Sequence, residues 1–132
     1  MKTLILLITF SISTFSFSQT FELSETMKGI YEASKIIEEK IDNEINDQEA
    51  IDTTYQLRRL TILAQFLIPS KLKDLEDDQR LKALKEYKAL LVKMEFFVDD
   101  LILSLKEKDF DRAFDNFMEI SSVRSTAHKK FK

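Results

Sequence analysis

The sequence predicts an all-α protein, an antiparallel up-down-up-down four-helix bundle preceded by a signal peptide. Three observations support this prediction. The 132 residues include one glycine and one proline, too few turn residues for a many-stranded β protein. Charged residues make up 33% of the chain, which is typical of long helices with solvated faces. Four stretches repeat apolar residues at steps of three and four, the spacing of one helix face.

The first 18 residues have the features of an export signal. Lys2 supplies a positive charge, residues 4–17 form an uncharged apolar run, and Ser16 and Ser18 are small residues where a signal peptidase reads. The apolar run is shorter than the roughly 20 residues that a membrane span needs. We therefore expect cleavage after Ser18, a mature domain of residues 19–132, a periplasmic location and no stable membrane insertion.

The first two predicted helices are separated by a polar stretch. The first covers residues 23–45, and its apolar face repeats through Met27, Ile30 and Ile37. Residues 46–49, Asn-Asp-Gln-Glu, match a capping box that opens the second helix. Pro69 ends the second helix, because proline has no backbone N–H and disfavours helix in the residue before it.

The third predicted helix carries the strongest periodic signal. Residues 70–78 form the longest connection, in which residues 71–76 could make one turn of helix, and the third helix begins near Gln79. Its core positions alternate strictly by three and four: Leu84, Tyr87, Leu91, Met94, Val98, Leu101 and Leu105. Asp109 is a natural N-cap for the fourth helix. That helix is expected to turn Phe110, Ala113, Phe117, Ile120 and Phe131 inward.

An up-down-up-down order brings the start of the first helix and the end of the last helix to the same end of the bundle. Met27 lies near the start of the first helix, and His128, the only histidine, lies near the end of the last. Both are roughly 6 Å from that end at 1.5 Å per residue. One level thus offers a thioether and an imidazole, which serve as axial haem ligands in electron carriers. Core packing of the methionine and solvation of the histidine are the simpler interpretations.

Composition narrows the possible functions. A net charge of -3 gives no basic footprint for nucleic acid. The chain has no cysteine, which excludes disulfides, zinc-thiolate sites and thioether-linked cofactors. Any haem would therefore be held without covalent bonds.

Several stretches resemble the cytochrome b-562 family. Residues 23–30 (LSETMKGI) and 34–37 (SKII) are similar to that family's opening helix, and residues 69–74 (PSKLKD) to its proline-containing loop. Residues 124–132 (RSTAHKKFK) resemble its final turn, with an Arg-x-x-x-His pattern. The resemblance covers essentially the whole mature chain. It implies a periplasmic electron-transfer protein with one non-covalent haem b held between Met27 and His128.

The same resemblance implies further roles. Arg124 would meet a haem propionate or the ring edge, and Ile30, Pro69, Tyr87 and Leu91 would contact the porphyrin. With both axial positions filled, iron has no open site for substrate, so we expect an electron carrier and not an enzyme. Its partners would be haem and an unidentified redox protein, and we expect a monomer. The alternative is a haem-free secreted helical bundle that acts as a protein-interaction module.

Overall fold

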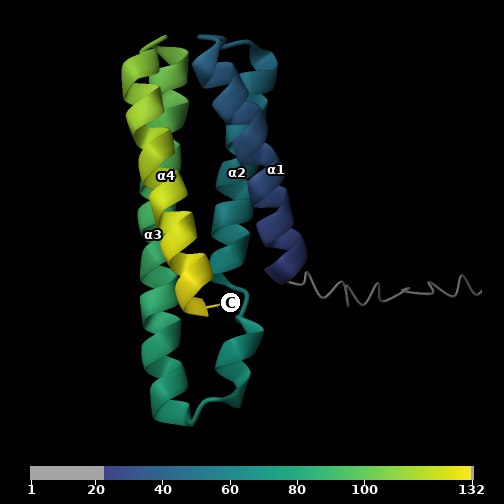
Figure 1. Cartoon of the computed structure of the whole chain (residues 1–132), viewed down its shortest axis with the longest axis vertical. Helices are drawn as coiled ribbons and strands as arrows, with labels where there is room; N and C mark the ends of the chain where they lie inside the picture. Colours follow the sequence, from purple (N-terminus) through teal and green to yellow (C-terminus); the bar gives the residue numbers. More distant parts are fainter. Residues whose placement is uncertain (1–22, 132) are drawn as a thin grey trace, which may run out of the picture.

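Four α-helices and one short 3-10 helix make up residues 23–131, the part of the chain that the computed structural model describes (Figure 1). They are α1 (Leu23–Asp42), α2 (Gln48–Gln65), η1 (Ser70–Asp74), α3 (Asp77–Lys106) and α4 (Phe110–Phe131). The described residues contain no β-strand, so the expected all-α helical bundle is confirmed. The expected signal peptide, residues 1–18, lies outside them. None of the described helices has an apolar stretch long enough to cross a membrane.

On α1, α3 and α4 the core is built from the helix faces that the periodicity predicted. On α2 the apolar pattern is misleading, because Tyr55 and Phe66 are exposed and the buried side chains are mostly small: Ala50, Thr53, Thr54, Leu57, Thr61 and Ala64. On α3 the predicted stripe is buried from Tyr87 to Leu105, and Leu84 packs against it half-buried. Helix α3 packs against both α2 and α4, and α1 packs against α2. Among these neighbouring α-helices, α1 and α4 share the fewest contacts. In Figure 1 the start of α1 and the end of α4 lie at the same end of the bundle, and η1 and the start of α3 extend beyond them.

Polar side chains link α2 to α3 along their length. Arg58 Nε donates a hydrogen bond to Asp99 Oδ1 at 2.6 Å, and Gln65 Nε2 donates one to Glu95 Oε2 at 2.7 Å. These contacts hold the two helices in one register.

A residue with left-handed backbone geometry that is not glycine follows the end of α1. Glu44 has a φ of 55°, and Ile45 N donates to Lys40 O at 2.8 Å, which is the outer bond of a Schellman motif. The expected helix over residues 23–45 is therefore wrong at its end, since α1 stops at Asp42. Lys108, after α3, has the same left-handed geometry with a φ of 57°.

The start of α2 also differs from the sequence prediction. Asp47 is the N-cap, and its Oδ1 accepts a hydrogen bond from Ala50 N at 2.9 Å. The predicted capping box over residues 46–49 is wrong, because Asn46 instead donates through Nδ2 to Leu105 O at 3.1 Å. Asn46 thereby joins the α1–α2 connection to the end of α3.

The other connections follow the prediction more closely. The expected turn of helix in residues 71–76 is present as η1. Helix α3 begins at Asp77, slightly before the predicted Gln79. Asp109 caps α4 as expected, because its Oδ1 accepts from Arg112 N at 3.1 Å.

Asp100 joins α3 to α4 through a charged network. Its carboxylate accepts hydrogen bonds from Arg112, including one from Nε at 3.0 Å, and from Asn116 Nδ2 at 2.7 Å. The hydrogen bond from the Arg112 guanidinium is the main cause that lowers the pKa of Asp100, and the Asn116 amide adds to it.

We predict that the free energy of unfolding falls as the pH drops through the lowered pKa of Asp100. A carboxyl group with a folded-state pKa below its unfolded value of about 3.9 stabilises the fold above that value, and this contribution is lost on protonation. Denaturant unfolding between about pH 6 and pH 2 measures the slope. Asp100→Asn should flatten the slope, and an unchanged slope in that variant would contradict the assignment.

Candidate functional site

A groove lies between α1 and α4, the neighbouring α-helices with the fewest contacts in the described residues. Its volume is about 310 Å³. It is lined by Tyr31, Ser34, Lys35 and Glu38 of α1 and by Phe117, Met118, Ser121 and Arg124 of α4. The groove therefore combines aromatic, thioether and charged groups along one seam of the bundle.

Tyr31 and Arg124 meet across this groove. The guanidinium carbon of Arg124 lies 5.4 Å from the centre of the Tyr31 ring, within the range of a cation–π contact. Arg124 is half-buried, and within the described residues its Nη1 is buried without a hydrogen-bond partner. A buried, charged donor without a partner is costly, so this guanidinium has capacity to bind an anionic group.

Met27 and His128 lie one helical turn from the Tyr31–Arg124 contact. Met27 precedes Tyr31 by four residues, and His128 follows Arg124 by four residues. Four residues advance about 6 Å along a helix axis. Because the start of α1 and the end of α4 lie at the same end of the bundle, both steps lead toward that end (Figure 1). By this helical rise Met27 and His128 lie at a similar height along the two helices. Met27 is half-buried against the core, His128 is exposed, and neither lines the groove.

The side chains expected to contact a porphyrin lie in the core. Ile30, Tyr87 and Leu91 belong to the main buried cluster, and Pro69 is also buried, at the residue before η1. None of these four residues lines the α1–α4 groove. Of the seven residues named from the sequence, only Arg124 lines it. A porphyrin could reach the four core side chains only if α1 and α4 moved apart.

Tyr87 connects three elements at this end of the bundle. Its hydroxyl donates to Ala64 O of α2 at 3.0 Å, and its ring meets the Phe131 ring of α4 edge-on at 5.4 Å. Burial raises the pKa of Tyr87 to about 12. The phenol is therefore neutral at physiological pH and acts as a hydrogen-bond donor.

Seven of the eight residues that line the groove were not predicted from the sequence as site residues, and Tyr31 and Met118 are two of them. Tyr31 lies four residues after Met27, and Met118 lies four residues after Phe114. Helical spacing marks both as possible members of a common face, but it does not show which neighbouring helices leave a groove. Met118 is 52% exposed and gives the groove a thioether of its own.

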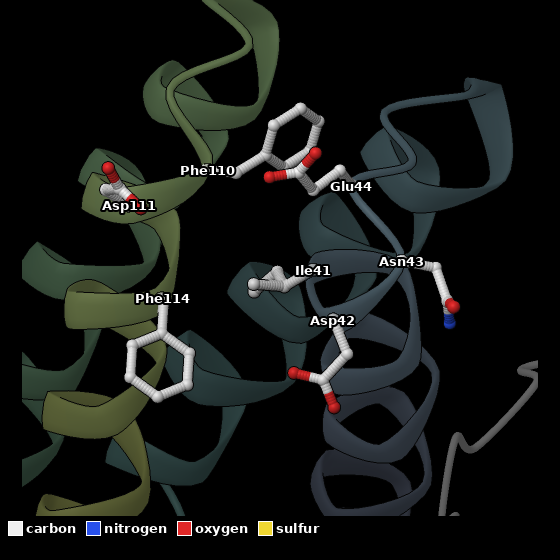
Figure 2. Close-up of a pocket in the computed structure, with 7 residues that line it drawn as sticks. All are labelled: Ile41, Asp42, Asn43, Glu44, Phe110, Asp111 and Phe114. Carbon is white, nitrogen blue, oxygen red and sulfur yellow. The ribbon is translucent and has the colours of Figure 1, made fainter.

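A second hollow, of about 340 Å³, lies at the other end of the same seam. Figure 2 shows its side chains on both sides of the space between α1 and α4. It is lined by Ile41, Asp42, Asn43, Glu44, Phe110, Asp111 and Phe114. This lining contains no imidazole or thioether, so it offers no axial ligand of the kind expected for haem.

Within residues 23–131, no three histidine, cysteine, aspartate or glutamate side chains gather in a way that could hold a metal ion. Comparison of the chain with family models, with curated proteins and with solved structures finds no match.

We predict that Tyr87→Phe lowers the free energy of unfolding by about 1 kcal/mol, because the Ala64 carbonyl loses a buried hydrogen bond. The variant should also change how the free energy of unfolding depends on pH under alkaline conditions. A tyrosine whose folded-state pKa exceeds its unfolded value of about 10 stabilises the fold below that value, and the contribution is lost as pH rises through the folded pKa. Denaturant unfolding at neutral and alkaline pH measures both effects.

Ultraviolet titration of the three tyrosines provides an independent check. One tyrosine of the wild-type protein should keep its proton until about pH 12, and this late component should be absent in Tyr87→Phe. A late component that persists in the variant would show that another tyrosine is the buried one.

Proposed function

We propose that this chain is a periplasmic b-type haem protein that carries single electrons, similar to the cytochrome b-562 family. Met27 and His128 would be the axial ligands of one non-covalent haem b. Arg124 would meet a propionate or the ring edge, and Ile30, Pro69, Tyr87 and Leu91 would contact the porphyrin. The redox partner would be a protein that remains to be identified.

The observation that carries this proposal is the contact between Arg124 and Tyr31, 5.4 Å from guanidinium carbon to ring centre. It joins α1 and α4 at one height, and one helical turn further along each helix this supports a similar height for Met27 and His128. His128 carries the only imidazole of the chain, and Met27 carries a half-buried thioether. The similar height of Met27 and His128 follows from the Tyr31–Arg124 contact and the helical rise, and it does not depend on the resemblance to the cytochrome b-562 family.

The chemistry of the side chains near this seam supports a haem, although the four porphyrin-contact residues lie in the core and would become accessible only if α1 and α4 moved apart. The buried Nη1 of Arg124 has no hydrogen-bond partner within the described residues, and a carboxylate is the group that would satisfy a guanidinium best. His128 is exposed and therefore accessible to a ligand that approaches the groove. The apolar side chains of Ile30 and Leu91 would exclude water from the inner edge of the site.

A haem held in this way supplies reversible one-electron transfer at its iron. The protein's contribution is to hold two ligands on separate helices. His128 would provide an imidazole nitrogen, and Met27 would provide a soft thioether, a ligand type that favours the reduced metal. Because both axial positions would be filled, substrate would find no open position, and we propose a carrier without enzymatic activity. Binding would require the α1–α4 seam, which has few contacts, to open around the ligand.

The proposal includes an antiparallel up-down-up-down bundle and an exported chain. Cross-helix contacts such as Arg58–Asp99 and Gln65–Glu95, whose numbers run in opposite directions, support the antiparallel order. The charged start, apolar run and small residues before Gln19 support a signal peptide cleaved after Ser18.

A haem-free interaction module is the second candidate. It is favoured by large apolar side chains at the surface, of which Phe66 and Phe96 are 72% and 68% exposed. Expression with haem available separates the two candidates. A haem carrier gives red protein with a sharp Soret band, and an interaction module gives colourless protein.

We predict that His128→Ala abolishes the low-spin haem spectrum and weakens haem binding by at least about 100-fold, because the chain has no other imidazole. Absorbance titration with haem measures both effects. Lys129→Ala, which changes the neighbouring exposed residue, is the matched control and should bind haem like the wild type. A low-spin spectrum that survives in His128→Ala would rule out this ligand.

We also predict that Met27→Ala opens the iron to outside ligands, because it removes the weaker axial bond. Its ferrous form should bind carbon monoxide readily, whereas the wild type should bind it slowly. The packing loss should lie near or below the lower end of the roughly 2–5 kcal/mol typical of buried methionine, since Met27 is only half-buried.

Two methionines serve as controls for Met27→Ala. Met94 is buried in the core of α3, and Met118 lines the groove on α4. Met94→Leu and Met118→Leu should both keep the wild-type haem spectrum. Loss of the low-spin spectrum in Met118→Leu, together with its retention in Met27→Ala, would transfer the axial role to Met118.

A further inference from the structure

The outer side of α3 carries an exposed apolar stripe that the proposed haem site does not use. Leu81, Val92, Phe96 and Leu103 are each between 45% and 68% exposed, although the opposite side of α3 forms the core. At 100° per residue these four side chains fall on one narrow face of the helix. In Figure 1 α3 lies behind α4 and away from α1, and none of these four residues lines the α1–α4 groove. Exposed apolar residues that share one face of a helix can mark an interaction site when the charged residues between them also fit a partner.

Charged residues interrupt the apolar ones in a regular order. The complete outer stripe of α3 consists of Leu81, Lys85, Lys88, Val92, Phe96, Asp99 and Leu103. All seven side chains are exposed. Successive members are separated by four, three, four, four, three and four residues, a coiled-coil rhythm that is symmetric about Val92.

The chemistry of the outer stripe of α3 is complementary to itself. When two copies of a helix pair in opposite directions about a two-fold axis at Val92, each position meets the position equally far on the other side of Val92. Leu81 then meets Leu103 of the second copy, and Lys85 meets Asp99. The central Val92 meets its own counterpart.

The remaining pair fits the same arrangement. Phe96, the most exposed apolar residue of the stripe, would meet Lys88 of the second copy, and an ammonium group over an aromatic ring is a favourable contact. Lys88 already lies 5.6 Å from the centre of the Phe66 ring in its own chain. The second copy's Phe96 would thus reach a lysine that is already in contact with an aromatic ring.

We propose that the protein forms a homodimer in which two α3 helices pair in opposite directions through this outer stripe. The inference replaces the monomer expected from the sequence. Asp99 also accepts a hydrogen bond from Arg58 of its own chain, but its side chain is 50% exposed, so the carboxylate can still face a second copy. Leu81 and Leu103 are roughly 33 Å apart along the helix. A single helix pair of this length is a small interface, which makes dimerisation dependent on protein concentration.

Sedimentation equilibrium of the exported protein tests the dimer. The average mass should rise from one to two chains as the concentration increases from about 1 μM to 500 μM, the range of a small interface. Val92→Glu brings two carboxylates together at the axis and should weaken dimerisation at least about tenfold. Met118→Glu changes a similarly exposed apolar residue on α4 and should leave it unchanged. A monomer throughout the range, or equal effects of the two variants, would overturn the proposal.

Single cysteines test the register, because the chain has none of its own. Under mild oxidation Val92→Cys should form a disulfide-linked dimer, since the axis brings position 92 close to itself. Leu81→Cys and Leu103→Cys should each remain uncrosslinked alone and should crosslink when mixed. Self-linking of Leu81→Cys would indicate parallel helices, and a dimer without the link at position 92 would place the interface elsewhere; either result overturns the proposed pairing. These measurements do not depend on haem binding. If no dimer forms, the proposed haem function is unaffected. If the protein forms the dimer but binds no haem, only the proposed haem function is refuted.

Discussion

Burial of one continuous side of α3 holds the described part of the bundle together. Tyr87 and Leu91 contribute to the core, and Tyr87 also binds the backbone of α2 through Ala64. Polar links extend the same connection, with Arg58 bound to Asp99 on one side and Arg112 bound to Asp100 on the other. Helices α2 and α4 are therefore both fixed to α3. Helix α1 is fixed mainly through α2, which leaves its contact with α4 the weakest of the neighbouring pairs.

This unequal packing has a functional consequence. A tightly packed interface would have to lose many contacts to admit a large planar ligand, whereas the seam between α1 and α4 already contains a groove. The seam also holds an arginine with a buried donor that lacks a partner in the described residues. The proposed haem ligands, Met27 and His128, lie on the two helices that border this seam. The strong packing of α3 thus stabilises the fold, and the weaker α1–α4 contact leaves room for a ligand.

Sequence periodicity predicted the core of α1, α3 and α4 because steps of three and four report which side of a helix is buried. It failed on α2, where alanine and threonine form most of the buried side and the larger Phe66 is exposed. The helix ends were less predictable: Glu44 adopts a left-handed geometry usually taken by glycine, and Asp47 rather than Asn46 caps α2. Of the residues predicted for the candidate site, Arg124 lines the groove and Met27 and His128 do not, and the prediction missed Tyr31 and Met118. The reason is that a helical pattern identifies a face without indicating how closely the neighbouring helix approaches it. The outer stripe of α3 was missed similarly, because its four apolar residues are separated by charged ones.

The central claim is that the thioether of Met27 binds iron opposite His128. Nuclear magnetic resonance of protein labelled at the methionine methyl groups tests this claim most directly, because the ring current of a porphyrin strongly shifts a methyl group held against it. When haem is added to the reduced protein, one methyl resonance should move far upfield, and that resonance should be missing in Met27→Leu. Met94 and Met118 should keep resonances near their original positions. A strongly shifted resonance that belongs to Met118, or the absence of any such shift on saturation with haem, would contradict the account.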